Sequence, residues 1–183
     1  MFRAIRPLLN INHIPKMTTN NIPAIQEKLY NPNLSAAEIH VMRDKGTERP
    51  FTSPFLEHET KPGFVGKYTC KNCDSLLYES STMFDSGCGW PSFHTSAKGN
   101  LYPDVANGAE IKGKSGKIGL KDNNIIQYVD NSLGMQRIEV CCLNCDSHLG
   151  HIFKGEGWEK VLGKGKNDRY CINGISLNFA EEK

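Results

Sequence analysis

The sequence predicts a mainly β domain whose two halves are joined by one metal ion. Short runs of alternating apolar and polar residues, such as 137–141, are separated by turn residues and indicate strands. Two Cys-x-x-Cys pairs, Cys70 with Cys73 and Cys142 with Cys145, lie far apart in the chain. Four thiolates in two such pairs suit one structural, tetrahedral Zn²⁺ with no open position, which places the chemistry elsewhere. The alternative is two separate redox dithiols.

The strands fall around the cysteine pairs and again near the C-terminus. Those beside the first pair would form a strand–knuckle–strand hairpin of the zinc-ribbon kind. The segment 98–124 is rich in Gly, Lys and Asn and predicts a long hairpin or a surface insertion. The expected strands comprise residues 66–70, 76–80, 125–129, 137–141, 169–173 and 175–179.

A short helix is expected at the N-terminal edge of the domain. The Ser35 side chain can accept from the amide of Glu38, and the Glu38 side chain can reach back to Ser35, which is a capping box. The helix would run from Ala36 to about Arg43 and stop before the next glycine.

The composition limits the class of protein. A chain of 183 residues with 38% hydrophobic residues fits one compact domain with extensions. No apolar run approaches the ~18 residues that span a bilayer, so no membrane association is expected. The seven cysteines are an odd number and no secretory signal precedes them, which favours reduced thiols and metal over a disulfide framework.

The N-terminal residues differ in charge from the rest. Residues 1–16 have a charge of +3, and the whole chain has a net charge of +2, so the remainder has a net charge of −1. A near-neutral body argues against a protein that binds the phosphate backbone of nucleic acids. Spaced basic residues between apolar ones, with no acid before Glu27, are typical of a mitochondrial leader. A start at Met17 would instead give a cytoplasmic form. We divide the chain into this leader, an extension at 17–34 and a domain at 35–180.

A candidate nucleophile lies in the last third of the chain. On a strand, Arg169, Cys171 and Asn173 would share one face, because alternate residues point the same way. A nearby guanidinium favours the thiolate, which is the nucleophilic form of cysteine. The alternative is a buried, structural cysteine.

Several other residues could serve the same chemistry. His148 and His151 could donate protons or hold a water, since four cysteines already saturate the metal. Trp90 could form one wall of an apolar pocket, although core packing is the alternative. Cys88, between two glycines, is the natural partner thiol for a sulfenic acid. Cys141 adjoins a metal ligand and is expected to point away from the metal with no role; the alternative is a second resolving thiol that competes with Cys88.

Four motifs carry a resemblance to a known family. They are GTERPFT (46–52), FDSGCGWPSF (84–93), HLGHIF (148–153) and RYCIN (169–173), and they occur in this order with both cysteine pairs. Together they resemble the type B methionine sulfoxide reductases. The resemblance implies that family's pair of antiparallel β-sheets, the β-tent, with Zn²⁺ on the four paired cysteines.

The resemblance also implies the reaction. Cys171 would attack the sulfoxide sulfur and become a sulfenic acid, Cys88 would convert it to a disulfide, and thioredoxin would regenerate both thiols. The substrate would be the R epimer of methionine sulfoxide, chiefly in oxidised proteins and more weakly as the free amino acid. This is protein repair after oxidative stress, and each epimer needs its own reductase. We expect a monomer that binds no nucleic acid.

The resemblance further implies roles for the remaining site residues. His148, His151 and Asn173 would position and protonate the departing oxygen, Trp90 would hold the substrate methyl group, and Arg169 would favour the thiolate. The sequence departs from the family pattern at three places near these motifs. Residues 154–157 read KGEG, where an acid–glycine–proline run is usual and Glu156 is a candidate replacement for the acid; Gly174 replaces a serine and Cys141 an arginine.

A different class of function remains as an alternative. A non-catalytic, zinc-containing β-tent binding module would share the knuckles and the aromatic walls but would need no reactive thiol. The motifs around Cys88 and Cys171 favour the enzyme, because such a module has no use for either sulfur.

Overall fold

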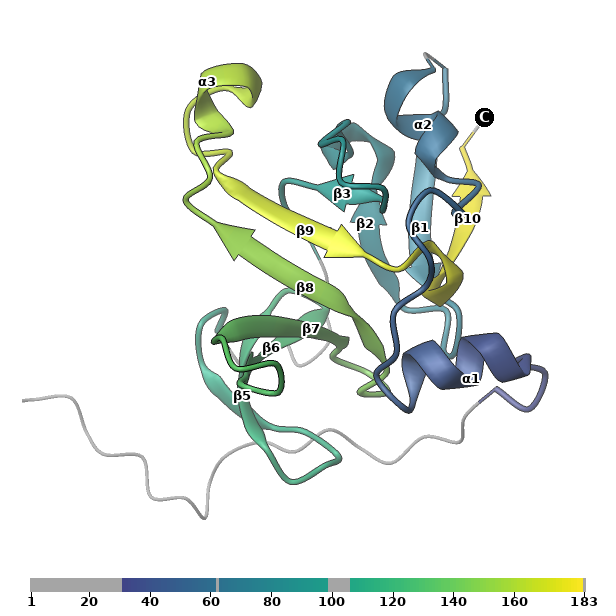
Figure 1. Ribbon diagram of the computed structural model, residues 1–183, viewed down its shortest axis with the longest axis vertical. Coiled ribbons are helices and arrows are strands. Elements are labelled where there is room, and N and C mark those ends of the chain that lie inside the picture. Colours follow the sequence, from purple (N-terminus) through teal and green to yellow (C-terminus); the bar gives the residue numbers. More distant parts are fainter. Residues whose placement is uncertain (1–30, 62, 99–105, 183) are drawn as a thin grey trace, which may run out of the picture.

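The protein folds into two antiparallel β-sheets, which confirms the predicted fold class (Figure 1). The computed structural model describes residues 31–61, 63–98 and 106–182. The leader at 1–16, most of the extension at 17–34 and residues 99–105 of the expected insertion lie outside the described residues. In the described part of the chain, no helix is both long enough and apolar enough to cross a membrane.

The smaller sheet has three strands in the order β10-β1-β2 and the larger has seven in the order β3-β9-β8-β7-β6-β5-β4. The smaller sheet contains β1 (Gly66–Cys70), β2 (Leu76–Glu79) and β10 (Leu177–Glu181). The larger contains β3 (Ser92–Phe93), β4 (Glu110–Lys112), β5 (Ile118–Asp122), β6 (Ile125–Asp130), β7 (Arg137–Cys142), β8 (His148–Lys154) and β9 (Asp168–Ile172).

Short helices complete the described part of the chain. They are α1 (Ala36–Met42), α2 (Leu56–Thr60) and α3 (Glu159–Leu162), with 3-10 turns at Ser80–Thr82 and Gly174–Ser176. The capping box at the start of α1 is present, because Glu38 N–H donates to Ser35 Oγ and Ser35 N–H donates to Glu38 Oε2. Buried Val41 and Met42 anchor this helix near β8 and the second 3-10 turn.

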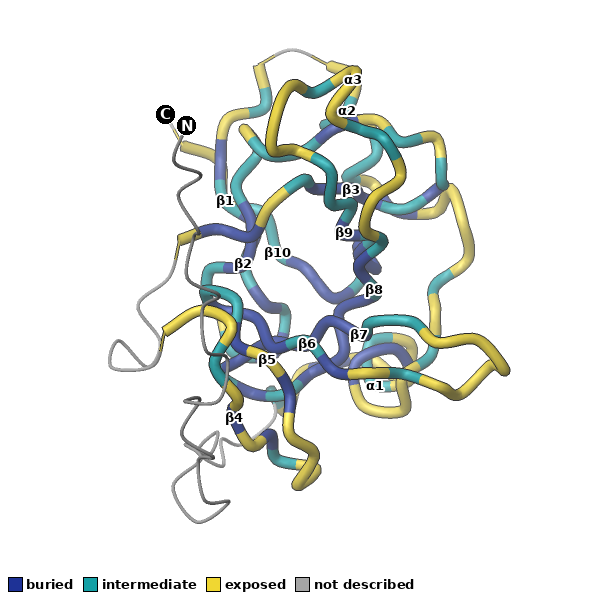
Figure 2. Tube along the Cα trace, turned by 90° about the vertical axis from the view of Figure 1, so that its left-hand side faces the viewer, coloured by how far each residue is buried: buried dark blue, intermediate teal, exposed yellow. Residues whose placement is uncertain are grey.

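The main core lies between the two sheets, where the buried segments of the chain converge (Figure 2). Tyr78 stacks on Phe93 with ring centroids 4.3 Å apart, and Tyr68 meets Phe93 edge to face at 5.1 Å. Burying each such side chain stabilises the fold by about 1.5–3 kcal/mol. Because Phe93 lies on β3 and both tyrosines lie on the smaller sheet, this packing joins the edge strand of the larger sheet to the smaller sheet.

The last strand begins later than predicted. We expected a strand over 175–179, but Gly174–Ser176 form a 3-10 turn and β10 starts at Leu177. The physical reason is a distant carboxylate, because Glu48 accepts hydrogen bonds from the amides of Gly174 and Ile175. These amides are therefore not available to a sheet ladder.

Candidate active site and metal centre

The two cysteine knuckles meet at one point between the sheets. The Sγ atoms of Cys70 and Cys145 are 3.6 Å apart, as are those of Cys73 and Cys142, and all four sulfurs lie within 4.8 Å of one another. A tetrahedron of thiolates at about 2.3 Å from an ion has edges of about 3.8 Å, so the four sulfurs are positioned to hold a metal ion.

The two knuckles have the same backbone form. Asp74 and Asp146 each follow the second cysteine of a pair, have φ of 56° and 61°, and donate their amides to the carbonyls of Cys70 and Cys142 at 2.8 Å. One knuckle joins β1 to β2 and the other joins β7 to β8. One ion would therefore tie the smaller sheet to the larger.

Cys171, near the C-terminal end of β9, lies close to Cys88. Ser92 on β3 pairs with Cys171 on β9, and this pairing brings the loop before β3 over the thiol. The two Sγ atoms are 3.6 Å apart. A disulfide has its sulfurs about 2.05 Å apart, so closure requires only a small movement. Gly87 and Gly89 flank Cys88 with φ of 70° and 91°, conformations that glycine adopts without strain.

This pair of thiols shares its protons unequally. The hydrogen bond from Cys171 lowers the pKa of Cys88 to about 4, and contacts with Ser86 and Ser92 act in the same direction. The same bond to Cys88, together with burial, raises the pKa of Cys171, and Arg169 only partly opposes this. Two thiolates this close repel each other, so the closed pair ionises once. Arg169 therefore acts on the pKa of Cys171 in the expected direction, and in this closed state the hydrogen bond to Cys88 and burial outweigh it.

A pocket of about 150 Å³ opens beside Cys171. Most sequence-predicted site residues line it together, and His148, Cys88 and Arg169 are not among its lining residues. The pocket is lined by Thr47, Trp90, Arg137, Gly150, His151, Phe153, Cys171 and Asn173.

Glu48 fixes two of the walls through its backbone. Trp90 Nε1–H donates to the Glu48 carbonyl at 3.1 Å, and the Glu48 amide donates to Asn173 Oδ1 at 3.0 Å. Asn173 Nδ2 in turn donates to the carbonyl of Leu149 at 3.0 Å. Both polar ends of the Asn173 amide are therefore held by the backbone, and the indole is held at its only donor.

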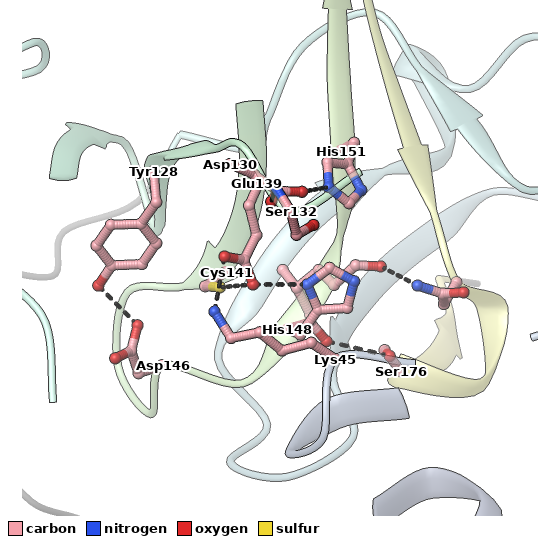
Figure 3. A network of polar contacts seen from close by, with 12 residues as sticks. Lys45, Tyr128, Asp130, Ser132, Glu139, Cys141, Asp146, His148, His151 and Ser176 are labelled. Carbon is pink, nitrogen blue, oxygen red and sulfur yellow. Dashed lines mark hydrogen bonds and ion pairs between the residues drawn. The ribbon is translucent and has the colours of Figure 1, made fainter. Parts of the chain in front are cut away.

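The two histidines of β8, His148 and His151, are each paired with a carboxylate from another strand (Figure 3). His148 Nδ1 lies 2.9 Å from Glu139 Oε1, and Lys45 Nζ lies 2.7 Å from Glu139 Oε2. Burial alone would raise the pKa of Glu139, but the hydrogen bonds from His148 and Lys45 lower it to about 2. His151 Nε2 lies 2.8 Å from Asp130 Oδ2, which also accepts from Arg137 Nη2 at 2.7 Å.

Cys141 belongs to the Glu139 network and points away from the metal centre. Its Sγ is 3.4 Å from Glu139 Oε1, and the residue is buried in a second cluster with apolar residues of β4, β6 and the second knuckle. Glu139, Cys141 and His148 lie close enough to suggest ligands. The Lys45 ammonium already supplies a cation to this carboxylate, so we interpret the group as an ion-pair network.

Arg169 has a two-pronged ion pair at the rim of the site. Its Nε and Nη2 lie 2.7 and 2.8 Å from the two carboxylate oxygens of Glu156, and its guanidinium stacks on Phe153 at 4.4 Å. Trp158 Nε1–H also donates to Glu156 at 2.9 Å. The acid of the unusual KGEG run therefore orients Arg169.

The comparison with known proteins fits this geometry. A family model described as "SelR domain" matches residues 34–111 and 117–181. Peptide methionine sulfoxide reductase 2 of Saccharomyces cerevisiae is 39% identical over 153 residues, which are 84% of this chain and 75% of the relative. Peptide methionine sulfoxide reductase MsrB of Alteromonas mediterranea is 36% identical over 159 residues, or 87% of this chain and 89% of the relative. The protein of the same name from Chromohalobacter salexigens is 37% identical over 153 residues, which are 84% of this chain and 91% of the relative.

The chain belongs to the SelR family. The resemblance predicted from the motifs is thereby confirmed, and the SelR match includes both cysteine knuckles and every residue of the pocket.

Sequence reasoning missed several polar residues of this SelR site. Arg137 and Glu139 alternate on β7, and this spacing signalled that they share the face that meets the histidines. Glu48 lies in the GTERPFT motif, but nothing local showed which amides it would bind. Asp130 carried no signal, because it ends its strand, β6, and reaches His151 on β8 across the intervening strand β7.

Proposed function

We propose that this SelR-family chain reduces methionine R-sulfoxide, chiefly in oxidised proteins, by transferring the sulfoxide oxygen to Cys171. The observation that carries the proposal is the pair of sulfurs 3.6 Å apart, one of which lines a pocket between an indole and an imidazole. The SelR family match and the relatives named peptide methionine sulfoxide reductase identify the chain as an oxidoreductase of the methionine sulfoxide reductase class. No observation favours the non-catalytic binding module over this function.

In the first step Cys171 Sγ attacks the sulfoxide sulfur while the oxygen takes a proton. The new bond between the two sulfurs and the sulfur–oxygen bond of the substrate then break, the oxygen ends on Cys171 as a sulfenic acid, and methionine is released with its sulfur reduced. Substrate entering beside Cys171 would separate it from Cys88. The hydrogen bond that raises the pKa of Cys171 would then be lost, and Arg169, which lowers that pKa, would dominate.

The pocket residues have distinct roles in this step. The Trp90 ring would receive the apolar methyl group, because its polar nitrogen is turned toward the Glu48 carbonyl. His151 and Asn173 line the pocket and would hold the sulfoxide oxygen. His148 is buried beside His151, with ring centroids 5.5 Å apart, and would act on the oxygen through its neighbour.

In the second step the Cys88 thiol attacks the sulfur of the sulfenic acid, forming the Cys88–Cys171 disulfide and releasing water. A dithiol reductant then exchanges with this disulfide, becomes oxidised itself and restores both thiols. We assign this role to thioredoxin. Cys88 lies on a glycine-flanked loop and is partly exposed, so an external thiolate can approach it.

The activity can be tested by turnover of separate R and S sulfoxide epimers with thioredoxin as reductant. The wild type is expected to consume only the R epimer, Cys171→Ser to consume none, and Cys88→Ser to complete one turnover and stop. Glu110→Gln, an exposed acid on β4 outside the pocket, is the control and should turn over like the wild type. Full activity of Cys171→Ser would refute the assignment, whereas turnover with other dithiols but not thioredoxin would refute only the partner.

We infer that the metal is one structural Zn²⁺ held by Cys70, Cys73, Cys142 and Cys145. Support comes from the all-thiolate donor set and the 3.6 Å sulfur separations, which suit a closed tetrahedral site. Metal analysis should give one zinc per chain in the wild type and in Cys171→Ser, but not in Cys142→Ser.

For the compartment we propose mitochondrial import through residues 1–16, supported only by their basic and acid-free composition. A fluorescent fusion of these residues should enter mitochondria, and a chain started at Met17 should remain in the cytoplasm. Cytoplasmic fluorescence of the first fusion would refute this proposal.

A further inference from the structure

A carboxylate outside the pocket contacts a histidine that lines it. We propose that Asp130, at the end of β6, is a positioning residue for the reductase reaction. It accepts the Nε2 hydrogen of His151, which leaves Nδ1 as the ring atom that meets the sulfoxide oxygen. This inference rests on the proposed function, because it assigns His151 to that oxygen.

The first step of the argument is the geometry of the pair. His151 Nε2 lies 2.8 Å from Asp130 Oδ2, and both side chains are only about 15% exposed. A carboxylate can only accept a hydrogen bond, so the proton of a neutral His151 ring must lie on Nε2. Figure 3 shows the other ring nitrogen on the side that faces away from Asp130.

The second step is that Asp130 is itself held in place and held ionised. Its Oδ1 accepts from the Ser132 amide at 2.9 Å, and its Oδ2 accepts from Arg137 Nη2 at 2.7 Å. Burial would raise the pKa of Asp130, but these bonds and the one to His151 lower it well below its usual range. Three donors from three positions therefore fix this carboxylate as a charged acceptor.

The third step concerns the charges that surround the ring. Asp130 faces His151 from β6, Arg137 and Glu139 from β7, His148 from β8, and Cys171 lies opposite it on β9. Burial lowers the pKa of His151, and Arg137 and His148 act in the same direction, while Asp130 opposes them.

The consequence for the reaction follows from this balance of charges. When His151 takes up a proton, Asp130 stabilises the imidazolium, and Nδ1–H can donate to the sulfoxide oxygen. Asp130 then holds the ring at Nε2, the nitrogen that faces away from the substrate. Carboxylates that accept a hydrogen bond from the second ring nitrogen of a functional histidine commonly orient the ring in this way.

The test compares Asp130→Asn with the wild type at saturating R-sulfoxide substrate. Asparagine keeps the size of the side chain but removes the charge, and its amide group can also donate, so the ring loses its fixed tautomer. We expect kcat for sulfoxide reduction to fall about 10- to 100-fold with KM changed less than about 3-fold. Asp130→Glu, which restores the charge, should recover part of kcat. Glu110→Gln, an exposed acid on β4, should leave kcat unchanged.

Two further measurements separate positioning from a structural effect. In a His151→Gln background, Asp130→Asn should cost little additional activity, because the proposed role acts through that ring, whereas a role through Arg137, which lines the pocket and pairs with Asp130, would persist there. Nitrogen-15 spectra of the imidazole should show Nε2 protonated in the wild type and a mixture of tautomers in Asp130→Asn.

Wild-type kcat in Asp130→Asn, or an equal loss in both backgrounds, would overturn the inference. Either result would leave the function intact as long as Cys171→Ser remains inactive. Activity of Cys171→Ser would instead remove the function on which the inference rests.

Discussion

The close contact between β8 and β9 can be tested by one added carbon atom. A Cβ built on Gly150 would lie 2.1 Å from the carbonyl oxygen of Cys171 and 3.0 Å from the Cα of Ile172. Both neighbours are backbone atoms, so no side chain can rotate away. In Gly150→Ala the two strands must separate by roughly 1.3 Å to reach an ordinary contact distance.

The same displacement acts on stability and on catalysis. Overpacking of this kind costs about 1–3 kcal/mol, which corresponds to a fall in Tm of about 2–12 °C for a domain of this size. The atom that is displaced belongs to Cys171 itself. A misplacement of about 1 Å at a reacting group can cost about 100-fold in rate, so we expect single-turnover sulfoxide reduction to slow by about that factor in the folded protein.

A matched variant separates these two effects. A Cβ on Gly119 would lie 2.7 Å from the carbonyl oxygen of Gln127, between β5 and β6 and away from the pocket. Gly119→Ala should therefore lower the free energy of unfolding in urea but leave the single-turnover rate unchanged. The reasoning fails if Gly150→Ala reduces sulfoxide at the wild-type rate, or if Gly119→Ala slows the reaction as much.

Three further predictions concern stability. Glu48→Gln keeps one carbonyl oxygen but loses one charge-assisted acceptor for the amides of Gly174 and Ile175, so urea unfolding should show a loss of about 1.5–3 kcal/mol; an unchanged midpoint would contradict this role. Burial raises the pKa of Glu59 from 4.5 to about 8, against the hydrogen bond from Ser92. The folded state therefore binds a proton that the unfolded chain releases, and the free energy of unfolding falls as pH rises between these values. Glu59→Gln should flatten that fall in a series of urea melts, and a slope equal to that of the wild type would show that Glu59 is not responsible. Removing the proposed zinc with a chelator should lower Tm sharply in both the wild type and Cys88→Ser, because an ion on the four paired cysteines would join the two sheets in each; an unchanged Tm would exclude a bracing role.

Local patterns in the sequence predicted much of this fold. Alternation marked β7, strand-forming residues marked β1 and β6, and the capping box marked α1, because these patterns are properties of neighbouring residues. The start of β10 could not be predicted in this way. It depends on Glu48, which lies more than a hundred positions earlier and takes the amides that a strand would use.

The candidate site, like the fold, was predicted from the sequence only where local spacing determines it. Spacing alone indicated the four metal ligands and placed Arg169 on the same strand face as Cys171. The protonation state of Cys171 could not be read from that spacing, because it depends on a second thiol brought to 3.6 Å by the pairing of β3 with β9. The partners of the two histidines likewise come from β6 and β7, whose register no local pattern specifies.

The proposed chemistry depends on the order in which two sulfurs react, and mass spectrometry after one equivalent of R-sulfoxide tests this directly. The wild type should lose two hydrogen atoms and yield a peptide linking Cys88 to Cys171. Cys88→Ser should instead gain one oxygen atom on Cys171, which a sulfenic acid reagent traps. Methionine formed without any change at either cysteine, or oxygen found first on Cys88, would contradict the account.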